Sequence, residues 1–283
     1  MPTFKIVLDS SSNFDFELAQ KYDIELIPYN IQMDEKHYKD LVDITSLEFF
    51  QKMGACHTLK TAIPSPQEIG DFLTDLESKG VTQVLFITTS QKLTGMQDLV
   101  HLVARSHPNL EIAVVDSRQA GATVGLIGIY ADKLRSEGKD FNTVVDTLNR
   151  KLPDASIHAL FRTLEYVIRG GRLSKVKGAI GMMLKIQPVL TISDGEITIT
   201  EKMRGIKRSR KQLITNIRKK IASGRPYYFA LFSGDNEEEL AILKTELDDV
   251  IAKADVYFEK EFTPVLGVHG GPNAIGASVF FTD

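Results

Sequence analysis

The chain has 283 residues, of which 43% are hydrophobic and 25% charged, an ordinary composition for a globular protein with a sizeable core. Its formal net charge of −3 predicts no overall attraction to nucleic acid or membranes, so charge-driven recognition has to be local. The single cysteine, Cys56, excludes an internal disulfide and fits a reducing compartment, and we expect a buried structural thiol. Without a secretory signal pattern or a bilayer-length apolar run, the sequence predicts a cytoplasmic protein.

The first half of the chain alternates strand-like and helix-like patterns. Strands are expected at residues 5–8, 25–31, 81–87 and 111–115, and helices at 14–22, 46–53, 66–79, from about 94 onward, and at 119–135. Residues 81–87 form a near-continuous apolar run, which is typical of a strand covered on both faces. This alternation predicts an α/β fold in which a parallel sheet carries helices on both faces.

The pattern changes near residue 157, where we place a domain boundary between residues 1–157 and 158–283. Strands are expected at 157–161, 189–193, 196–201, 227–232, 256–261 and 277–281, and helices at 178–184, 207–221 and 237–250. Asp194 and Gly195 separate two of these strands and are a strong hairpin signal. Residues 267–276 are expected to form a glycine-rich turn. The second domain is therefore also expected to be α/β.

Hydroxyl-bearing residues follow the predicted parallel strands, at the edge where ligands of open sheets bind. They lie at residues 10–12, 88–90 and 117, and we expect Asp9 and Asp116 beside them to be structural helix caps. Thr94 and Gly95 fall where we expect a helix N-terminus, at which free N–H groups and the helix dipole attract an anion. Thr61 belongs to a loop fixed by two prolines.

Near the C-terminus, His269 lies among glycines, where a lone histidine is more often structural than functional. The chain has no Walker loop, dinucleotide fingerprint, HExxH, CxxC or GxSxG motif, so no cofactor or metal is expected. The case for an enzyme is weak. A small esterase or thioesterase that uses a Thr–His pair stays open as an alternative, although no acid is visibly placed to orient the histidine.

Taken in order, these segments resemble the DegV family of fatty-acid-binding proteins. The matching stretches run through nearly the whole chain, at residues 7–12, 61–66, 93–95, 114–120, 163–166, 170–174, 185–190 and 269–272. The resemblance implies a two-domain α/β protein that buries a long-chain fatty acid between or within its domains. It also implies a non-catalytic role: the protein presents the carboxylate to a separate fatty acid kinase catalytic subunit, which makes acyl phosphate for phospholipid synthesis.

By the same resemblance, Thr61, Thr94, Gly95 and His269 are expected to hold the carboxylate. Further residues expected beside the head group or the tail are Ala62, Ile63 and Gly270. The sequence departs from the family pattern where Ala62 and Ile63 replace polar residues, where Met96 replaces a hydroxyl residue, and where Asn273 replaces a glycine. These changes keep open a carrier for another lipid, such as an isoprenoid acid.

Apolar material for a tail-binding site is present at Ala179, Ile180, Met182, Met183 and Leu184, and in the helix around residues 124–129. A basic cluster between residues 169 and 211 lacks the interleaved aromatic residues that stack on nucleic-acid bases. It is better suited to an acidic partner or to a transient contact with anionic lipid head groups. By resemblance, we expect Arg172 and Arg204 to contact the kinase subunit.

Overall fold

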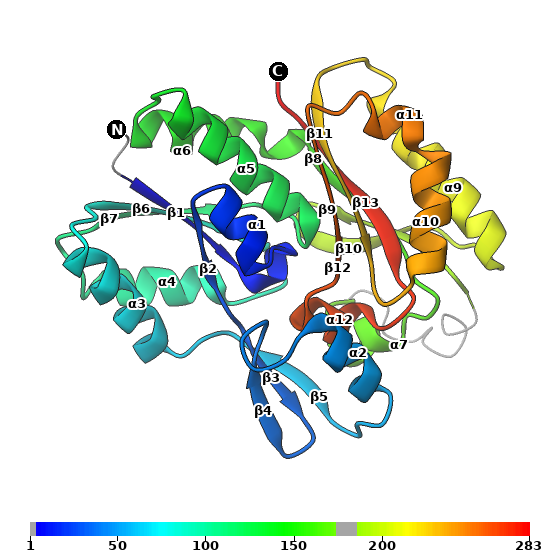
Figure 1. Cartoon of the computed structure of the whole chain (residues 1–283), viewed down its shortest axis with the longest axis horizontal. Helices are drawn as coiled ribbons and strands as arrows, with labels where there is room; N and C mark the ends of the chain where they lie inside the picture. The colour runs from blue at the N-terminus through cyan, green and yellow to red at the C-terminus, as the bar shows by residue number, and fades with distance from the viewer. Residues whose placement is uncertain (1–3, 174–185) are drawn as a thin grey trace.

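The computed structural model describes residues 4–173 and 186–283. In this part of the chain, the strands form sheets of four, six and three members, in the orders β2-β1-β6-β7, β10-β9-β8-β13-β11-β12 and β4-β3-β5. Figure 1 shows the four-stranded and six-stranded sheets side by side, with the three-stranded sheet extending below them.

The four-stranded sheet is parallel throughout, as predicted. It comprises β1 (Phe4–Asp9), β2 (Ile24–Ile27), β6 (Gln83–Thr88) and β7 (Glu111–Asp116). Helices α3 (Pro66–Ser78) and α4 (Met96–Ala104) cover one face, and α5 (Ala122–Ser136) and α6 (Phe141–Lys151) cover the other (Figure 1). Helix α1 (Phe16–Lys21) packs beside β2. The sequence had not predicted α6.

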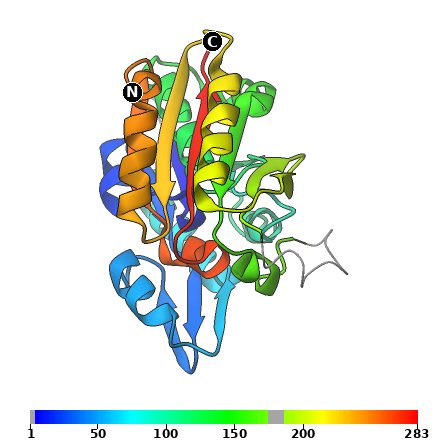
Figure 2. The same cartoon turned by 90° about the vertical axis from the view of Figure 1, so that its right-hand side faces the viewer.

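The six-stranded sheet is mixed. Its strands are β8 (Ala155–Leu160), β9 (Val189–Ser193), β10 (Glu196–Glu201), β11 (Tyr227–Ser233), β12 (Val256–Glu261) and β13 (Ile275–Phe281). Only β11 and β12 pair in parallel. Figure 2 shows α9 (Ile206–Ile221) and α10 (Glu237–Glu246) on its outer face, where α10 is followed by α11 (Asp248–Ile251). The domain division at residue 157 stays a prediction.

The predicted hairpin is confirmed between β9 and β10. Asp194 and Gly195 at its tip have φ angles of 50° and 77°, the left-handed pair that a tight two-residue hairpin turn needs. Asn and Asp tolerate this region better than other residues with a side chain, and glycine adopts it without strain.

Helix α5 packs between the four-stranded and six-stranded sheets, and contacts β1 on one side and β11 and β13 on the other. Nearly all of its residues are buried, because a helix that is apolar around its whole circumference needs cover on every side. A Cβ on Gly125 would lie 2.5 Å from the ring of Phe14, so this ring leaves no room for a larger residue. Residues 124–129, considered for tail binding, are therefore core.

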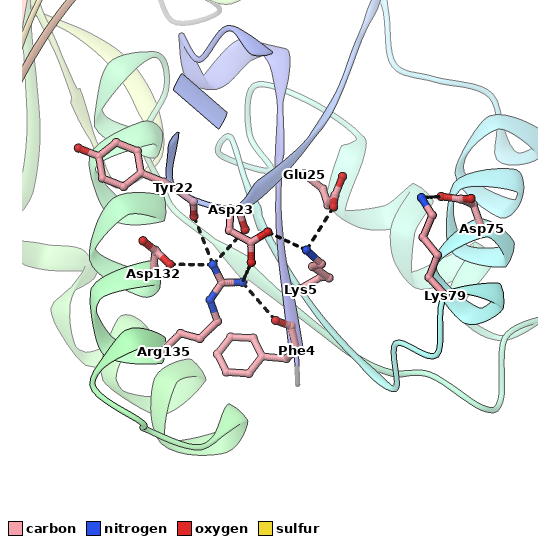
Figure 3. A network of polar contacts seen from close by, with 9 residues as sticks. All are labelled: Phe4, Lys5, Tyr22, Asp23, Glu25, Asp75, Lys79, Asp132 and Arg135. Carbon is pink, nitrogen blue, oxygen red and sulfur yellow. Dashed lines mark hydrogen bonds and ion pairs between the residues drawn. The ribbon is translucent and has the colours of Figure 1, made fainter. Parts of the chain in front are cut away.

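Arg135 in α5 connects this helix by hydrogen bonds to the edge of the four-stranded sheet (Figure 3). Its guanidinium is almost fully buried and donates to the carbonyl oxygens of Phe4, Tyr22 and Asp23, and to the carboxylate of Asp132. In the same view, Lys79 pairs with Asp75 one turn away on α3, where both side chains are exposed. The Arg135 contacts connect α5 to β1 and to the residues before β2, whereas the Lys79–Asp75 pair stays within one helix and its C-cap residue.

The three-stranded sheet was not predicted as such. It consists of β3 (Asn30–Met33), β4 (Lys36–Lys39) and β5 (Leu59–Ala62), all antiparallel, and α2 (Ser46–Met53) lies between β4 and β5 in the chain. The expected single strand at 25–31 is divided between β2 and β3. Thr61, expected in a loop, lies in β5. Short, half-exposed strands such as β4 have little apolar alternation, so their sequence signal is weak.

The expected glycine-rich turn at residues 267–276 is wrong over its first part, where helix α12 (Pro264–Gly270) forms. Two of its glycines are required by packing: a Cβ on Gly267 would lie 2.5 Å from Phe49, and one on Gly270 would lie 2.6 Å from Phe262. Glycine is unfavourable in helices, so tertiary packing overrides the local preference here. Figure 1 shows α12 where the three sheets approach one another.

The remaining short helices are η1 (Ser10–Ser12), η2 (Leu152–Asp154) and α7 (Glu165–Arg169). The predicted helix at residues 178–184, with its candidate tail residues, lies outside the described residues. Among the described helices, none has the length and apolar character needed to cross a membrane. Cys56, expected to be buried, is half-buried; its thiol donates to the Lys52 carbonyl, and burial raises its pKa.

Candidate functional site

A pocket lies where the carboxyl ends of β1 and β6 meet the six-stranded sheet and α12. It encloses about 890 Å³ of atom-free space, part of which is open to solvent. Most of its wall is apolar. The apolar side chains come from the six-stranded sheet, from the residues that directly follow β8 and β12, and from α12: Ile157, Ala159, Phe161, Leu190, Ile192, Ile197, Phe232, Phe262, Val265 and Leu266.

Thr61 and His269 meet in this pocket, although they are 208 residues apart. Oγ1 of Thr61, on β5, lies 2.8 Å from Nε2 of His269, near the end of α12. Burial, reinforced by the charge of Arg172, lowers the pKa of His269 to about 3, so the ring is neutral at neutral pH.

The second ring nitrogen of His269 indicates which tautomer is present. Nδ1 is buried and has no hydrogen-bond partner among the described residues. A buried donor without an acceptor is costly, so the proton belongs on Nε2, which then donates to Thr61 Oγ1. The Thr61 hydroxyl hydrogen is thereby left to donate to a ligand.

Thr94 and Arg172 complete the polar part of the wall. The Thr94 hydroxyl lies 2.9 Å from the Tyr29 hydroxyl, immediately before α4, whose first turn has no side-chain cap. Arg172 donates from Nε to the Leu93 carbonyl, and its charge acts on both Tyr29 and His269. The Arg172 guanidinium and several hydroxyls thus converge on one part of the pocket, an arrangement suited to an anion.

The structure brings some of the predicted residues together and leaves others apart. Thr61, Thr94, His269 and Gly270 all line the pocket. Gly95, Ala62 and Ile63 do not. Ala62 is exposed, and Ile63 is half-buried beside Gly95. Of the two predicted partner contacts, Arg172 is half-buried in the pocket wall and Arg204 is exposed just before α9.

Sequence reasoning missed Ser11, Tyr29 and Thr89, which also line the pocket. The hydroxyls after β1 and β6 were visible in the sequence, but helix capping explained them equally well. Tyr29 carried no signal, because its position depends on the turn between β2 and β3. Asp9 caps η1 by accepting from the Ser11 N–H, as predicted. Asp116 instead accepts the loop N–H groups of Gln91 and Arg118 and caps none of the described helices.

The Thr61–His269 pair is poorly arranged for hydrolysis. A hydrolytic histidine needs an acid on its other nitrogen and a pKa that allows it to take a proton near neutral pH. No carboxylate within the described residues meets Nδ1, and the pKa of about 3 leaves His269 a weak base. Within residues 4–173 and 186–283, no group of three His, Cys, Asp or Glu side chains could hold a metal ion.

The fold and the pocket define a class: a three-sheet α/β protein with an apolar pocket that carries one anion-suited polar region. The chain belongs to the DegV family, because the sequence model of the protein family described as "Uncharacterised protein, DegV family" matches residues 3–282. A DegV domain-containing protein of Caldanaerobacter subterraneus is 30% identical over 287 residues, covering 100% of both chains. One from Clostridium acetobutylicum is 28% identical over 283 residues, covering 99% of both.

Solved structures agree with this assignment. A fatty-acid-binding DegV family protein from Thermus thermophilus is 26% identical, superimposes with a TM-score of 0.90, and is matched over 99% of each chain. A stearic-acid-binding protein from Eubacterium ventriosum is 27% identical with a TM-score of 0.86, over 99% of this chain and 98% of that one. The α/β fold is therefore that of the DegV structures.

Proposed function

We propose that this protein binds one long-chain fatty acid and is itself non-catalytic. The observation that carries the proposal is the division of the pocket wall into an extended apolar surface and one anion-suited region around Thr61, Thr94 and His269. A fatty acid has the same division, with a long apolar tail and one charged end. The ligands named for the Thermus and Eubacterium relatives support this choice.

The energetics divide the work between tail and head group. Burying about 15 methylenes gains on the order of 12 kcal/mol gross, from which ordering and immobilisation of the chain subtract a large part. Each hydrogen bond to a charged carboxylate contributes roughly 1.5–3 kcal/mol before desolvation. The tail therefore dominates affinity, while Thr61, Thr94 and the positive charge of Arg172 decide which way the acid faces.

The orientation matters because the protein presents the carboxylate to a separate fatty acid kinase subunit, which phosphorylates it to acyl phosphate. Exposed cations near the start of α9 offer a docking surface for an acidic partner. Cations at a helix N-terminus add to the positive end of the helix dipole, and the first turn of α9 has no acidic residue to offset them. These exposed residues are Lys202, Arg204, Lys207, Arg208 and Lys211.

Mass spectrometry of an organic extract of the purified protein tests the ligand. We expect one long-chain fatty acid per protein molecule. Repeated recovery of empty protein that binds no long-chain acid contradicts the proposal, and another lipid in the extract favours the alternative carrier.

The non-catalytic role needs a separate assay. Without a partner, the protein is expected to leave p-nitrophenyl palmitate intact, whereas addition of the kinase subunit and ATP is expected to give acyl phosphate. Hydrolysis of the ester by the protein alone, abolished in His269→Ala, would instead support the esterase alternative.

A further inference from the structure

Ser11 and Thr89 form a second polar region of the pocket wall, placed over a buried acid. The Oδ1 atom of Asp9 accepts the backbone N–H of Ser11 at 3.0 Å and also accepts the Ser11 hydroxyl. The Ser11 hydroxyl lies 2.8 Å from that of Thr89. Asp9 is 2% exposed, Ser11 7% and Thr89 5%, so bulk water does not compete for these bonds.

The number of hydrogens available to these groups determines which of them donates in each hydrogen bond. Because Oδ1 of Asp9 accepts a backbone N–H, it carries no proton and also receives the single hydroxyl hydrogen of Ser11. Ser11 then has no hydrogen left, so Thr89 has to donate to Ser11. Burial raises the pKa of the Asp9 carboxyl. The direction of donation, from Thr89 to Ser11 and from Ser11 to Asp9, is the same whether or not the other oxygen of Asp9 is protonated.

As a result, this part of the pocket wall can accept hydrogen bonds from a ligand but cannot donate them. Both hydroxyl hydrogens point along the chain toward Asp9, so Ser11 and Thr89 present acceptor atoms to the pocket. The other oxygen of Asp9, Oδ2, is buried as well. A carboxylate, which can only accept, finds no donor here, in contrast to the region of Thr61 and Arg172.

We propose that Ser11 and Thr89, oriented by Asp9, form a subsite that accepts a hydrogen bond from a ligand hydroxyl. The protein would then take long-chain acids that are hydroxylated close to the carboxyl group, an inference that rests on the proposed function. Tyr29 sets the spacing: its hydroxyl bonds to Thr94 in the carboxylate region and also interacts with Ser11 and Asp9. One side chain thus spans both regions, which points to a hydroxyl on C2 or C3.

Competition titrations with delipidated protein test the subsite. The probes are hexadecanoic acid and both enantiomers of 2-hydroxy- and 3-hydroxyhexadecanoic acid. At least one hydroxy acid is expected to bind about fivefold more tightly than the parent acid, as one net hydrogen bond allows. If no hydroxy acid binds more tightly than hexadecanoic acid, the subsite does not exist. If no acid binds at all, the proposed function itself fails.

Variants separate the subsite from general effects on the pocket, because the ratio of two affinities within one variant cancels losses in folding. In Thr89→Val and Ser11→Ala, the hydroxy acid is expected to bind no more tightly than hexadecanoic acid, so the preference for the hydroxy acid is lost. Thr89→Ser keeps the hydroxyl and is expected to keep the preference. Thr61→Val is expected to weaken all acids by the same factor. A preference that persists in both Thr89→Val and Ser11→Ala overturns the assignment.

Discussion

Thr61 and His269 are joined by a 2.8 Å hydrogen bond between Oγ1 and Nε2, which connects the three-stranded sheet to α12 across 208 residues of sequence. Burial keeps the ring neutral by lowering the pKa of His269 to about 3, and its proton on Nε2 is donated to Oγ1. The bond also directs the Thr61 hydroxyl hydrogen into the pocket, which makes this pair the starting point for tests of the carboxylate site.

Replacing Thr61 with valine keeps the volume of the side chain but removes its donor. We expect the affinity for hexadecanoic acid to fall by about tenfold or more, which corresponds to one charged hydrogen bond of roughly 1.5–3 kcal/mol. Titration calorimetry measures it. Thr245→Val is the matched control, because Thr245 is exposed on α10 and bonds only within its own helix. Equal affinities for the two variants would remove Thr61 from the site.

Gly170 allows His269 to occupy its position. A Cβ on Gly170 would lie 2.2 Å from Nδ1 of His269, so Gly170→Ala has to displace the ring. We expect a folded protein with a binding loss of about tenfold, similar to that of His269→Ala. Gly54→Ala is the control, because no atom lies within 4 Å of its Cβ position. Unchanged fatty-acid binding by Gly170→Ala would show that the ring position is unimportant.

Asp40 fixes the start of α12, because its Oδ1 accepts the Val265 N–H at 3.2 Å. Burial raises the pKa of Asp40 to about 7. The folded state therefore holds this proton more tightly than the unfolded chain, and ionisation lowers stability as pH rises from about 4 to 7. The difference in free energy of unfolding between Asp40→Asn and wild type should therefore be about 2 kcal/mol more favourable to the variant at pH 7 than at pH 5.

Urea unfolding at the two pH values measures this difference. The neighbouring buried carboxyl is Asp9, which is present in both proteins, so the comparison isolates Asp40. A constant gap between the wild-type and Asp40→Asn stabilities across this range would mean that Asp40 stays ionised in the folded protein.

Arg135→Met tests the attachment of α5 to the sheet edge. The change leaves one buried carbonyl, two half-buried carbonyls and the Asp132 carboxylate without their donor, so we expect a loss of about 3 kcal/mol in the free energy of unfolding. Lys79→Met removes the exposed pair in the same view and is expected to change stability little (Figure 3). Similar losses in both variants would contradict a special role for Arg135.

The sequence predicted best the elements whose own residues determine them. Helix α2 starts and ends where expected, because Thr45 and Glu48 form a capping box and the apolar residues repeat at helical spacing. The β9–β10 hairpin followed from Asp194-Gly195. The parallel sheet followed from the alternation of apolar strands with helices.

The site was harder to predict, because its residues come from separate elements. Thr61, Thr94 and His269 were chosen through the family resemblance, since no local pattern connects residues 208 positions apart. Helix α12 was missed because Gly267 and Gly270 disfavour a helix unless Phe49 and Phe262 pack against them. Arg172 looked like part of a surface charge cluster, and only the folded chain places it in the pocket wall.

The most direct test of fatty-acid binding is a calorimetric titration of delipidated protein with hexadecanoic acid and, in parallel, with hexadecanol. The two ligands share the same tail, so they separate the apolar wall from the carboxylate region. We predict saturable binding of one acid per protein, at least tenfold tighter than the alcohol, with the difference greatly reduced in Thr61→Val. No saturable binding of the acid, or equal affinities for acid and alcohol, would contradict the account.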